Sequence, residues 1–516
     1  MSGTGKTVNT VSTTGNGLID GVLSGSAWGL TITYAFPGSS SSYSYSGEKD
    51  NGFAQISSAQ MNAARFAMEE KYGSAANDGF SVEGFTNARF DETSSTTSAT
   101  IRFAQSTLPE TAWAYLPDSG AWGGDIWFGT EYAGTVNDYR KPVAGNYAWH
   151  TLLHELGHAL GLKHGHESET NNGVTYKPLP TQYDSIEYSI MTYRGYVGGY
   201  GYDYEQYGAP QTFMMADIAA LQEMYGADFS TNSGNTVYKW TPSSGATLVN
   251  GSAGISPGAN RIFATIWDGG GEDTYDLSAY TTGLKVDLRP GKASTFSADQ
   301  LAYLGGGPNN GFAAGNIFNA LLYHGKTGSL IENVNGGSAG DTITGNQAAN
   351  KLWGNGGNDT LWGDVGNDWL YGGAGADKVN GGGGSDSLYS HSGNDALFGS
   401  TGADKLTGGT GADTFVFKAL TESTVAASSR DTIYDFLGSE SDRIDLSAID
   451  ADTVTTGDQA FTFVGTAVFG GKKGELRYVR DVSDTYIYGD VNGDMTADFA
   501  IQLDDAVTLQ KGYFVL

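Results

Sequence analysis

The 516-residue sequence contains no cysteine, although it is long enough for about three average domains. This absence excludes disulfide bonds, thiolate metal sites and cysteine nucleophiles, and it leaves the redox compartment open. No run of about 18 apolar residues is present, so no membrane-spanning helix is expected. Residues 1–30 also lack the basic and apolar regions of a cleavable secretory signal, so that export route is not expected.

Basic side chains are scarce in this sequence. It holds 28 Lys and Arg residues against 57 Asp and Glu residues, which gives a formal net charge of −29 at pH 7. A surface of this charge repels nucleic acid and anionic membranes. We therefore expect no nucleic-acid partner.

Glycine is abundant, with 77 residues or about twice the usual share, and its distribution reveals a repeat. Nine units of nine residues run without interruption from Gly336 to Val416. The eighth position of every unit is apolar, and the sixth is Asn350 in one unit and aspartate in the other eight. These aspartates are Asp341, Asp359, Asp368, Asp377, Asp386, Asp395, Asp404 and Asp413.

The repeat predicts a parallel β-roll that binds calcium. A unit of the form Gly-Gly-x-Gly-x-Asp-x-apolar-x combines a tight turn with a short strand, and two units complete one coil. Turn carbonyls and aspartate carboxylates are the hard oxygen ligands that Ca²⁺ prefers, so we expect several structural ions, with weaker sites at Asn350 and Ser390. The alternative, a flexible glycine-rich linker, does not explain an apolar residue at every ninth position.

The region before the repeats has the spacing of an α+β domain. Helical patterns run from a Ser58 cap to Gly73 and from Met214 to Tyr225, and short β-type runs lie between residues 101 and 128. We divide the chain into an α+β domain at 1–228, β segments with calcium sites at 229–335, the nine repeats at 336–416 and a C-terminal β region at 417–516.

Five of the seven histidines lie between residues 150 and 166. Residues four apart share one face of a helix, so His154 and His158 can present two imidazoles to one metal. Gly161 can take a positive φ and turn the chain, which lets His164 supply a third nitrogen. Three protein nitrogens leave one position open for water, as in catalytic zinc sites. The spacing therefore predicts one catalytic zinc ion.

Glu155 lies one step round the same helix, near the metal but outside its ligand set. Zinc lowers the pKa of a bound water from about 15.7 to about 7, and Glu155 is placed to accept the proton as general base. We expect a structural role for His150 and a solvated side chain at His166. The alternative, an amphipathic helix with incidental histidines, does not account for five fixed residues at the spacing of an extended zinc-protease motif.

The histidine motif, the segment Ser189-Ile190-Met191-Thr192-Tyr193 and the nonapeptide array together resemble the metzincins, and within them the serralysin family of secreted bacterial metalloproteases. Gly165 follows the third histidine, where astacins have glutamate. The resemblance implies a metzincin-like α+β protease domain, with a candidate propeptide at its start, followed by an all-β parallel β-roll and β-sandwich region. It also implies that Met191 packs beneath the zinc site and that Tyr193 is a further zinc ligand and stabilises the oxyanion.

Calcium sites before the array are also implied by this resemblance. One site would use carbonyls and carboxylates of Asn232, Gly234, Thr236, Asp268, Gly270 and Asp273. A second would use Gly271, Asp273, Leu330 and Glu332. The segment 490–494 has oxygen-ligand spacing as well, with a polar hairpin turn as the alternative.

The function implied by the resemblance is that of a secreted, extracellular zinc endopeptidase of broad specificity. Extended protein and peptide substrates would lie along the strand 112–116. The tyrosine-rich segment 193–207 is either an aromatic wall of the cleft or a packed loop. Further implied partners are a type I exporter, which reads an uncleaved C-terminal signal, and a small periplasmic protease inhibitor; a monomer is expected.

Two other functions remain open at the level of the sequence. The first is a calcium-dependent surface or adhesion protein with an inactive protease domain, against which the intact Glu155 argues. The second is a metalloenzyme of another hydrolase class, against which Met191 and Tyr193 together argue. Protein hydrolysis with and without a zinc chelator separates all three.

Overall fold

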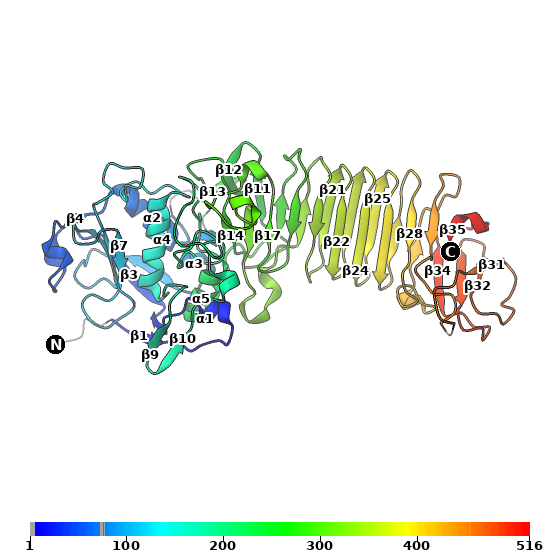
Figure 1. Ribbon diagram of the computed structural model, residues 1–516, viewed down its shortest axis with the longest axis horizontal. Helices are drawn as coiled ribbons and strands as arrows, with labels where there is room; N and C mark the ends of the chain where they lie inside the picture. Colours follow the sequence, from blue (N-terminus) through cyan, green and yellow to red (C-terminus); the bar gives the residue numbers. More distant parts are fainter. Residues whose placement is uncertain (1–5, 73–75, 77, 454) are drawn as a thin grey trace. The chain divides into compact units, whose positions relative to one another are not determined.

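The computed structural model describes residues 6–72, 76, 78–453 and 455–516, and the chain packs as two compact units (Figure 1). The first contains Met1–Asp273 with Pro290–Leu330, and the second contains Thr274–Arg289 with Ile331–Leu516. The domain boundary near residue 228 stays a prediction. Across the described ranges, no helix has the length and apolar character that crossing a membrane requires.

A mixed β-sheet supports the histidine helix in the first unit. Its strands are β3 (Thr31–Ala35), β4 (Ala54–Gln55), β5 (Arg89–Glu92), β6 (Ile101–Gln105), β7 (Ala112–Ala114) and β8 (Asp125–Phe128). The strands β5, β3, β6 and β8 run parallel in this order, β7 pairs antiparallel with β8 at the end of the sheet, and β4 pairs antiparallel with β6. Every residue of β6 and β8 is buried, as expected for central parallel strands.

The helices of the first unit begin and end at residues that suit helix termini. They are α1 (Gly17–Asp20), α2 (Ser58–Met68), α3 (Val82–Phe85), α4 (Tyr147–Leu160) and α5 (Met215–Tyr225). The prediction of a Ser58 cap is wrong by one residue, because Ser57 and Gln60 form a reciprocal capping box. The predicted end at Gly73 lies outside the described residues. The helix α5 ends before Gly226 as predicted.

Shorter strand pairs complete the first unit. They are β1 (Val8–Thr10) with β2 (Ser26–Trp28), β9 (Glu169–Asn171) with β10 (Val174–Tyr176), β11 (Val237–Thr241) with β12 (Ser244–Val249) and β13 (Ser252–Ile255), and β14 (Ala264–Ile266) with β18 (Ile317–Asn319) and β17 (Ala293–Ser294). The N-terminal segment is joined to the chain after α4, because Val22 O accepts a 2.8 Å hydrogen bond from Lys163 N and Ser24 N donates one of 3.1 Å to Gly161 O.

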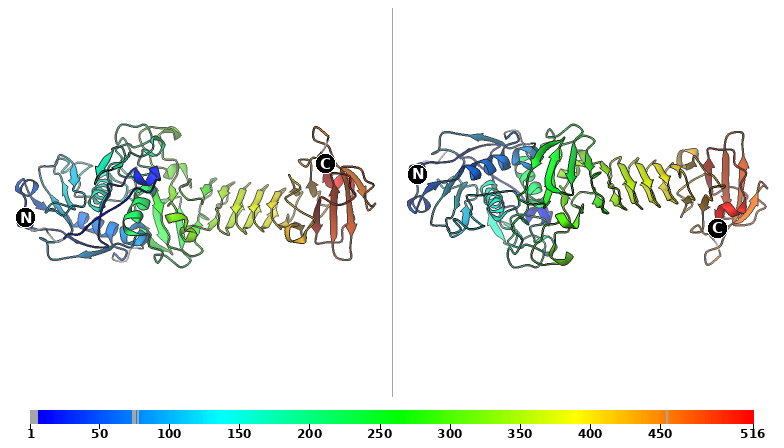
Figure 2. Two further views of the ribbon diagram at one scale, coloured as in Figure 1. Left: turned by 90° about the horizontal axis from the view of Figure 1, so that it is seen from below. Right: turned by 90° about the horizontal axis from the view of Figure 1, so that it is seen from above.

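Two parallel sheets form a β-roll in the second unit, in which the strands lie side by side as rungs (Figure 2). One sheet contains β15 (Thr274–Asp276), β19 (Asn333–Asn335), β21 (Lys351–Gly356), β23 (Trp369–Ala374), β25 (Ser387–Ser392), β27 (Lys405–Thr407) and β29 (Thr432–Ile433). The other contains β16 (Lys285–Asp287), β20 (Thr342–Thr344), β22 (Thr360–Val365), β24 (Lys378–Gly383), β26 (Ala396–Thr401), β28 (Thr414–Val416), β30 (Arg443–Asp445) and β35 (Phe514–Val515).

The register of the roll follows the nonapeptide period. Leu352 pairs with Leu370 in one sheet and Leu361 with Val379 in the other, and every strand from β19 to β26 pairs with the strand 18 residues later. This spacing confirms that two units make one coil. The eighth residue of every unit is fully buried between the sheets. Gly384 shows why the turns need glycine, because its φ is +141° and a Cβ there would collide with Gly366 O in the preceding coil.

Carboxylates cap the roll after the last repeat. Asp435 accepts hydrogen bonds from the N–H groups of Gly408 (2.9 Å) and Gly409 (2.7 Å). Glu440 accepts one from Gly411 N (3.0 Å). These side chains replace the partners that another coil would offer to the last turn. The first sheet then continues through β34 (Phe499–Leu503), β33 (Thr485–Asp490), β32 (Glu475–Arg480) and β31 (Thr462–Gly465).

The segment 490–494 joins β33 to β34 as a hairpin connection. Both oxygens of Asp490 accept backbone N–H groups, from Gly493 at 2.7 Å and Met495 at 2.9 Å. Asp494 likewise accepts a hydrogen bond from Thr496 N at 2.8 Å. These local bonds favour the polar hairpin turn over a cation site.

Replacing Leu388 by alanine should destabilise the calcium-loaded roll by about 2–5 kcal/mol, because it leaves a cavity among fully buried side chains. The free energy of unfolding in urea at saturating calcium measures this loss. Ser387→Ala, one residue away on the outer face of β25, is the matched control and should change that free energy by less than about 0.5 kcal/mol. Equal losses in both variants would contradict the inward orientation of Leu388.

Candidate metal centres

Helix α4 carries the first two histidines of the motif and packs against β7, β8 and α2 (Figure 1). Asn146 caps its first turn by accepting a hydrogen bond from Trp149 N at 2.8 Å. The helix ends at Gly161, where φ is +114° and a Cβ would collide with Ser26 O. The chain reverses there, as predicted, and brings His164 back towards the helix.

Three imidazole nitrogens meet at one point above this helix. The Nε2 atom of His158 lies 3.1 Å from Nε2 of His154 and 3.0 Å from Nε2 of His164. The structure therefore brings the three predicted zinc ligands together.

The opposite nitrogen of each ring binds a group that only accepts hydrogen bonds. Because carbonyl and carboxylate oxygens have no proton to give, each Nδ1 carries the hydrogen and each Nε2 keeps its lone pair. The pairs are His154 Nδ1 with Ile190 O (2.8 Å), His158 Nδ1 with Leu162 O (2.8 Å) and His164 Nδ1 with Glu167 Oε2 (3.0 Å).

This donor set fits a zinc ion. Three lone pairs about 3 Å apart repel one another unless a cation lies among them, and protonation is opposed by burial. Burial, with the neighbouring His164, lowers the pKa of His158 to about 3, and burial lowers that of His154 in the same direction. Nitrogens fixed by hydrogen bonds at the far side of the ring are the usual zinc ligands.

Glu155 lies beside the three histidines on α4 and is buried. Within the part of the chain that the structure describes, its Oε2 atom has no hydrogen-bond partner. Burial raises the pKa of this carboxyl to about 8. A buried carboxyl with a free oxygen and a pKa near neutrality can, in its ionised form, accept a proton from a group that enters the cleft and give it back.

Tyr193 stands over the imidazoles with 44% of its surface exposed. Its ring centroid is 5.5 Å from that of His154 and 4.5 Å from that of His164. Burial, with the nearby Glu155, raises the pKa of its phenol to about 12. The structure thus places this predicted ligand beside the histidines.

The two histidines assigned no metal differ in their surroundings. His150 is buried; its Nδ1 atom lies 2.9 Å from the hydroxyl of Tyr204 and its Nε2 atom 3.4 Å from Ile190 O. Burial lowers its pKa to about 4. His166 is half-buried and stacks on His164, with ring centroids 5.2 Å apart. Neither lies among the three converging nitrogens.

Two cavities flank Glu155 along the end strand β7. The one of about 380 Å³ is lined mainly by aromatic rings, including Tyr200 and Tyr202, and the other, of about 250 Å³, by β7, Lys163 and the chain after His164. The tyrosine-rich segment has both predicted characters. Tyr202 donates a 2.5 Å hydrogen bond to Thr192 O, whereas Tyr200 is 98% exposed at the cavity.

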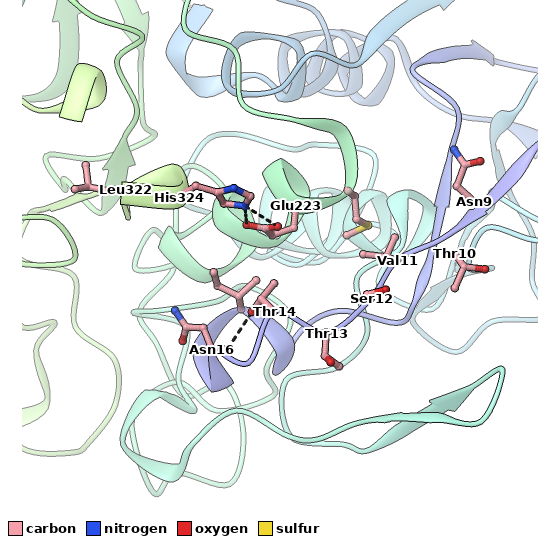
Figure 3. A pocket seen from close by; sticks show the side chains of 12 residues that line it. Asn9, Thr10, Val11, Ser12, Thr13, Thr14, Asn16, Glu223, Leu322 and His324 are labelled. Atoms are coloured by element: carbon pink, nitrogen blue, oxygen red, sulfur yellow. Dashed lines mark hydrogen bonds and ion pairs between the residues drawn. The ribbon is translucent and has the colours of Figure 1, made fainter. Parts of the chain in front are cut away.

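A larger cavity of about 630 Å³ lies elsewhere in the first unit (Figure 3). Its walls are the extended segment 9–16, the end of α5 and the loop 322–324. His324 Nε2 lies 2.8 Å from a carboxylate oxygen of Glu223 there. Among the described residues, no third metal ligand lies beside this pair. The candidate catalytic residues therefore lie at the smaller cavities beside Glu155.

The first predicted calcium site has its residues in one place in the first unit. Asp273 Oδ1 accepts a hydrogen bond from Thr236 N at 2.8 Å, and Asp268 Oδ1 accepts one from Gly270 N at 2.9 Å. The Thr236 hydroxyl lies 3.2 Å from Asn232 O and 3.0 Å from Gly234 O. Burial raises the pKa of both carboxyl groups, and for Asp268 the neighbouring Asp273 adds to the rise. Two buried carboxylates among carbonyls suit a cation.

The second predicted calcium site stays a prediction. Gly271, Asp273 and Leu330 belong to the first unit and Glu332 to the second.

Seven aspartates of the roll share one arrangement. Each accepts through Oδ1 the backbone N–H of the residue 18 positions earlier, and among the described residues its Oδ2 has no hydrogen-bond partner. They are Asp359, Asp368, Asp377, Asp386, Asp395, Asp404 and Asp413.

Asp368 illustrates why this arrangement fits calcium. A Cβ at Gly363 would collide with its Oδ2 atom, so only glycine leaves room beside the carboxylate. Burial, with the nearby Asp386, raises the pKa of Asp368 to about 7. A buried oxygen with no donor, next to glycine carbonyls, is stabilised by a hard cation.

The remaining predicted positions of the array differ from these seven. Asp341 binds backbone N–H groups through both oxygens, from Leu284 at 2.8 Å and Gly337 at 2.7 Å. Asn350 accepts a hydrogen bond from Asn346 N at 2.7 Å and donates one to Glu332 O at 2.9 Å.

Asp431 continues the ladder and was missed in the sequence. Its Oδ1 accepts a hydrogen bond from Asp404 N at 3.0 Å, and its Oδ2 has no partner among the described residues. Burial, with Asp404, raises its pKa to about 9. The signal was present, because Asp431-Thr432-Ile433 repeats the order Asp-x-apolar outside the nine-residue register.

The chain is similar to known proteins both by a family model and by curated sequences. The family model described as Peptidase M10 serralysin C terminal matches residues 227–515. Among curated proteins, Serralysin G of Dickeya chrysanthemi is 31% identical over 257 residues, 48% of each chain. Metallopeptidase AprA of Pseudomonas marginalis is 30% identical over 290 residues, 53% of each chain. Metalloprotease AprA of Pseudomonas entomophila (strain L48) is 35% identical over 187 residues, 34% of this chain and 36% of the relative.

The chain spans about half the length of the curated relatives it matches. Among solved structures, the AlgE6R3 subunit of the Azotobacter vinelandii mannuronan C5-epimerase is 26% identical over 34% of this chain and 78% of that chain. Its TM-score of 0.15 is too low to support a structural comparison. Because the family model covers more than half of the sequence, from the end of α5 through the roll, the chain belongs to the serralysin family of M10 peptidases.

Proposed function

We propose that this chain is a secreted zinc endopeptidase that hydrolyses peptide bonds in proteins with broad specificity. The observation that carries the proposal is the convergence of three imidazole Nε2 atoms beside the buried Glu155. The relatives named serralysin and metalloprotease support the same activity. The metzincin-like fold of the protease domain belongs to this proposal.

In this proposal His154, His158 and His164 hold one zinc ion, with Tyr193 as a further ligand. When bound, zinc supplies Lewis-acid activation of a water molecule and of the scissile carbonyl. The imidazoles bind as neutral donors, since each Nδ1 proton is held by an acceptor.

Glu155 moves the proton that hydrolysis requires. Its carboxylate accepts a proton from the water whose oxygen attacks the carbonyl carbon, and returns that proton to the amide nitrogen as the C–N bond breaks. The products are an amine and a carboxylic acid, which ionises in water, and Glu155 is regenerated as a carboxylate. The side chain is buried beside the cleft and has a free oxygen for this task.

Tyr193 donates a hydrogen bond to the oxyanion that forms during the attack. In this role the hydroxyl would be displaced from the ligand set, and a phenol, whose ordinary pKa is about 10, is protonated at neutral pH and can donate. A donor aimed at developing charge in a water-poor site contributes strongly to catalysis. Met191 packs beneath the site and takes no part in the chemistry.

Substrates are proposed to lie extended along β7. This strand ends its sheet, so its outer edge is available for pairing with the backbone of a peptide. Backbone pairing places little demand on sequence, which agrees with broad specificity. The two cavities beside Glu155 would then take side chains on either side of the cleaved bond.

Calcium is proposed to have a structural role at the roll and before it. The roll ions would bind the Oδ2 atoms of Asp431 and of the seven roll aspartates whose Oδ2 has no partner among the described residues, together with turn carbonyls. Asp341 would contribute by giving up its bond to Gly337 N. Before the roll, one ion would use Asn232, Gly234, Thr236, Asp268, Gly270 and Asp273. Another would use Gly271, Asp273, Leu330 and Glu332.

Export and partners follow from the family resemblance. We propose secretion by a type I exporter that reads a C-terminal signal, a small periplasmic inhibitor as a further partner, and a monomeric enzyme. Without calcium the aspartates repel one another, so the roll should stay unfolded during passage through an exporter.

Glu155→Ala should abolish proteolysis while zinc stays bound, because the carboxylate moves protons and is not a ligand. We expect casein hydrolysis to fall by about 10²- to 10⁴-fold, with one zinc ion per chain by metal analysis. Glu223→Ala, an acid that lines the separate cavity at the end of α5, is the control and should keep near wild-type activity. Casein hydrolysis at the wild-type rate by Glu155→Ala would overturn the mechanism. An inactive wild type that still binds zinc would favour the adhesion-protein alternative.

Tyr193→Phe should lower kcat by about 10²- to 10³-fold and change KM much less, since the hydroxyl acts on the oxyanion. Zinc content should barely change. Steady-state kinetics on a peptide substrate measure both constants. Tyr196→Phe, in the same segment but outside both cavities beside Glu155, is the control and should leave kcat and KM unchanged. An unaltered kcat would remove Tyr193 from the catalytic residues.

Removal of calcium should unfold residues 336–416 in the full-length chain, because buried carboxylates lose the cations that offset their repulsion. Hydrogen exchange measured by mass spectrometry should show fast exchange there in excess chelator. Protection should return as calcium rises through about 10⁻⁴ to 10⁻³ M, the range typical of extracellular modules. Full protection of this segment in chelator would contradict a calcium-dependent roll.

A further inference from the structure

A buried carboxylate on α5 takes no part in the proposed reaction. Asp217 is fully buried in the first unit, close to the start of the helix. Its oxygens accept three hydrogen bonds: Ser189 Oγ–H at 2.5 Å, Ile190 N–H at 2.8 Å and Met214 N–H at 3.0 Å. Two of these bonds fix the segment Ser189–Met191 from below.

The segment that Asp217 fixes also orients two zinc ligands. Ile190 O accepts the hydrogen bond from His154 Nδ1 at 2.8 Å. Met191 O accepts one from Gly165 N at 2.9 Å, and Gly165 directly follows His164. The two neighbouring carbonyls therefore hold the first histidine by its ring and the third by its backbone.

The same segment is also held by a hydrogen bond of its own and by a contact with α4. Ser189 Oγ accepts a hydrogen bond from Met191 N at 3.0 Å, which closes a tight turn. The Met191 sulfur lies against Gly157, where a Cβ would come within 2.6 Å of it. These contacts restrict the turn on the side of α4. The bonds to Asp217 restrict it on the other side and so fix the direction of its carbonyls.

We propose that Asp217 is the positioning residue of the zinc site, acting through the turn 189–191 on His154 and His164. The inference rests on the proposed zinc site. Groups that orient metal ligands typically change metal affinity by about 10- to 100-fold when they are replaced. Asp217 lies one step further from the metal, because it fixes the backbone whose carbonyl orients His154.

The position requires a carboxylate because every neighbouring group donates. One oxygen of Asp217 accepts both backbone N–H groups, and the other accepts the serine hydroxyl. An asparagine has one accepting oxygen, which can keep the two N–H bonds, and its NH₂ group would face the Ser189 hydroxyl, which could accept it only by turning its own proton away. Asp217→Asn therefore keeps the shape of the side chain but removes the charge and ends the donation from Ser189 that holds the turn.

The test measures zinc binding in the full-length protein. Asp217→Asn should raise the zinc dissociation constant, determined by competition with a chelator, by about 10- to 100-fold. The absorption spectrum of the Co²⁺-substituted variant should shift, because the geometry of two ligands changes. Neither readout depends on peptide hydrolysis.

Glu187→Gln is the matched control. Glu187 is another buried carboxylate near the site, and it accepts a hydrogen bond from Ala314 N at 2.7 Å. No bond joins it to the turn among the contacts of the described residues, so its zinc affinity and Co²⁺ spectrum should match those of the wild type. Ser189→Ala removes one of the three bonds to Asp217 together with the bond from Met191 N that closes the turn, and it should also weaken zinc binding, even if Asp217→Asn fails to fold.

The outcomes separate this inference from the proposed function. A wild type that binds no zinc would overturn the proposed function. Wild-type zinc affinity in Asp217→Asn, or in Ser189→Ala if the first variant does not fold, would overturn the positioning role and leave the proposed function standing. Equal weakening in Glu187→Gln would also overturn it, since it would show general loosening of the fold.

Discussion

Both units of this protein are constrained by buried side-chain lone pairs that no hydrogen-bond donor satisfies. In the first unit they belong to three imidazole nitrogens, and in the second to the Oδ2 atoms of aspartates along the roll. Burial removes the water that would otherwise solvate such atoms, and it opposes charge on the groups themselves. A bound cation would stabilise such atoms.

The backbone decides which atom of each side chain is left for a cation. Carbonyls take the Nδ1 protons of His154 and His158, and backbone N–H groups take the Oδ1 atoms of the roll aspartates. Glycines serve the same end by leaving space, as Gly363 does beside the carboxylate of Asp368. In both units hydrogen bonds on the far side of the side chain therefore orient the candidate ligand atom.

Features that repeat along the chain could be predicted from the sequence. The shared face of His154 and His158 and the 18-residue register follow from local periods, and the structure has both. Features that depend on contacts between residues distant in the sequence could not be predicted. Asp217 is one of two acids in a largely apolar helix, and its role emerges only when the fold brings Ser189 to it. Asp341 accepts a hydrogen bond from Leu284, which lies 57 residues earlier. The capping residue of α2 could not be predicted either, because Ser57 and Ser58 both suit a helix cap. The hydrogen bond from Ser57 N to the Gln60 side chain decides between them.

The alternation of strands between two sheets sets the step in which the roll can change length. A gain or loss of 18 residues leaves every later strand in its own sheet and keeps Asp431 in line with Asp404. A gain or loss of nine would transfer each later strand to the opposite sheet and carry the capping carboxylates of Asp435 and Glu440 to the wrong side. Arrays of this kind can therefore lengthen or shorten only by whole coils, so their unit of duplication is twice the unit visible in the sequence.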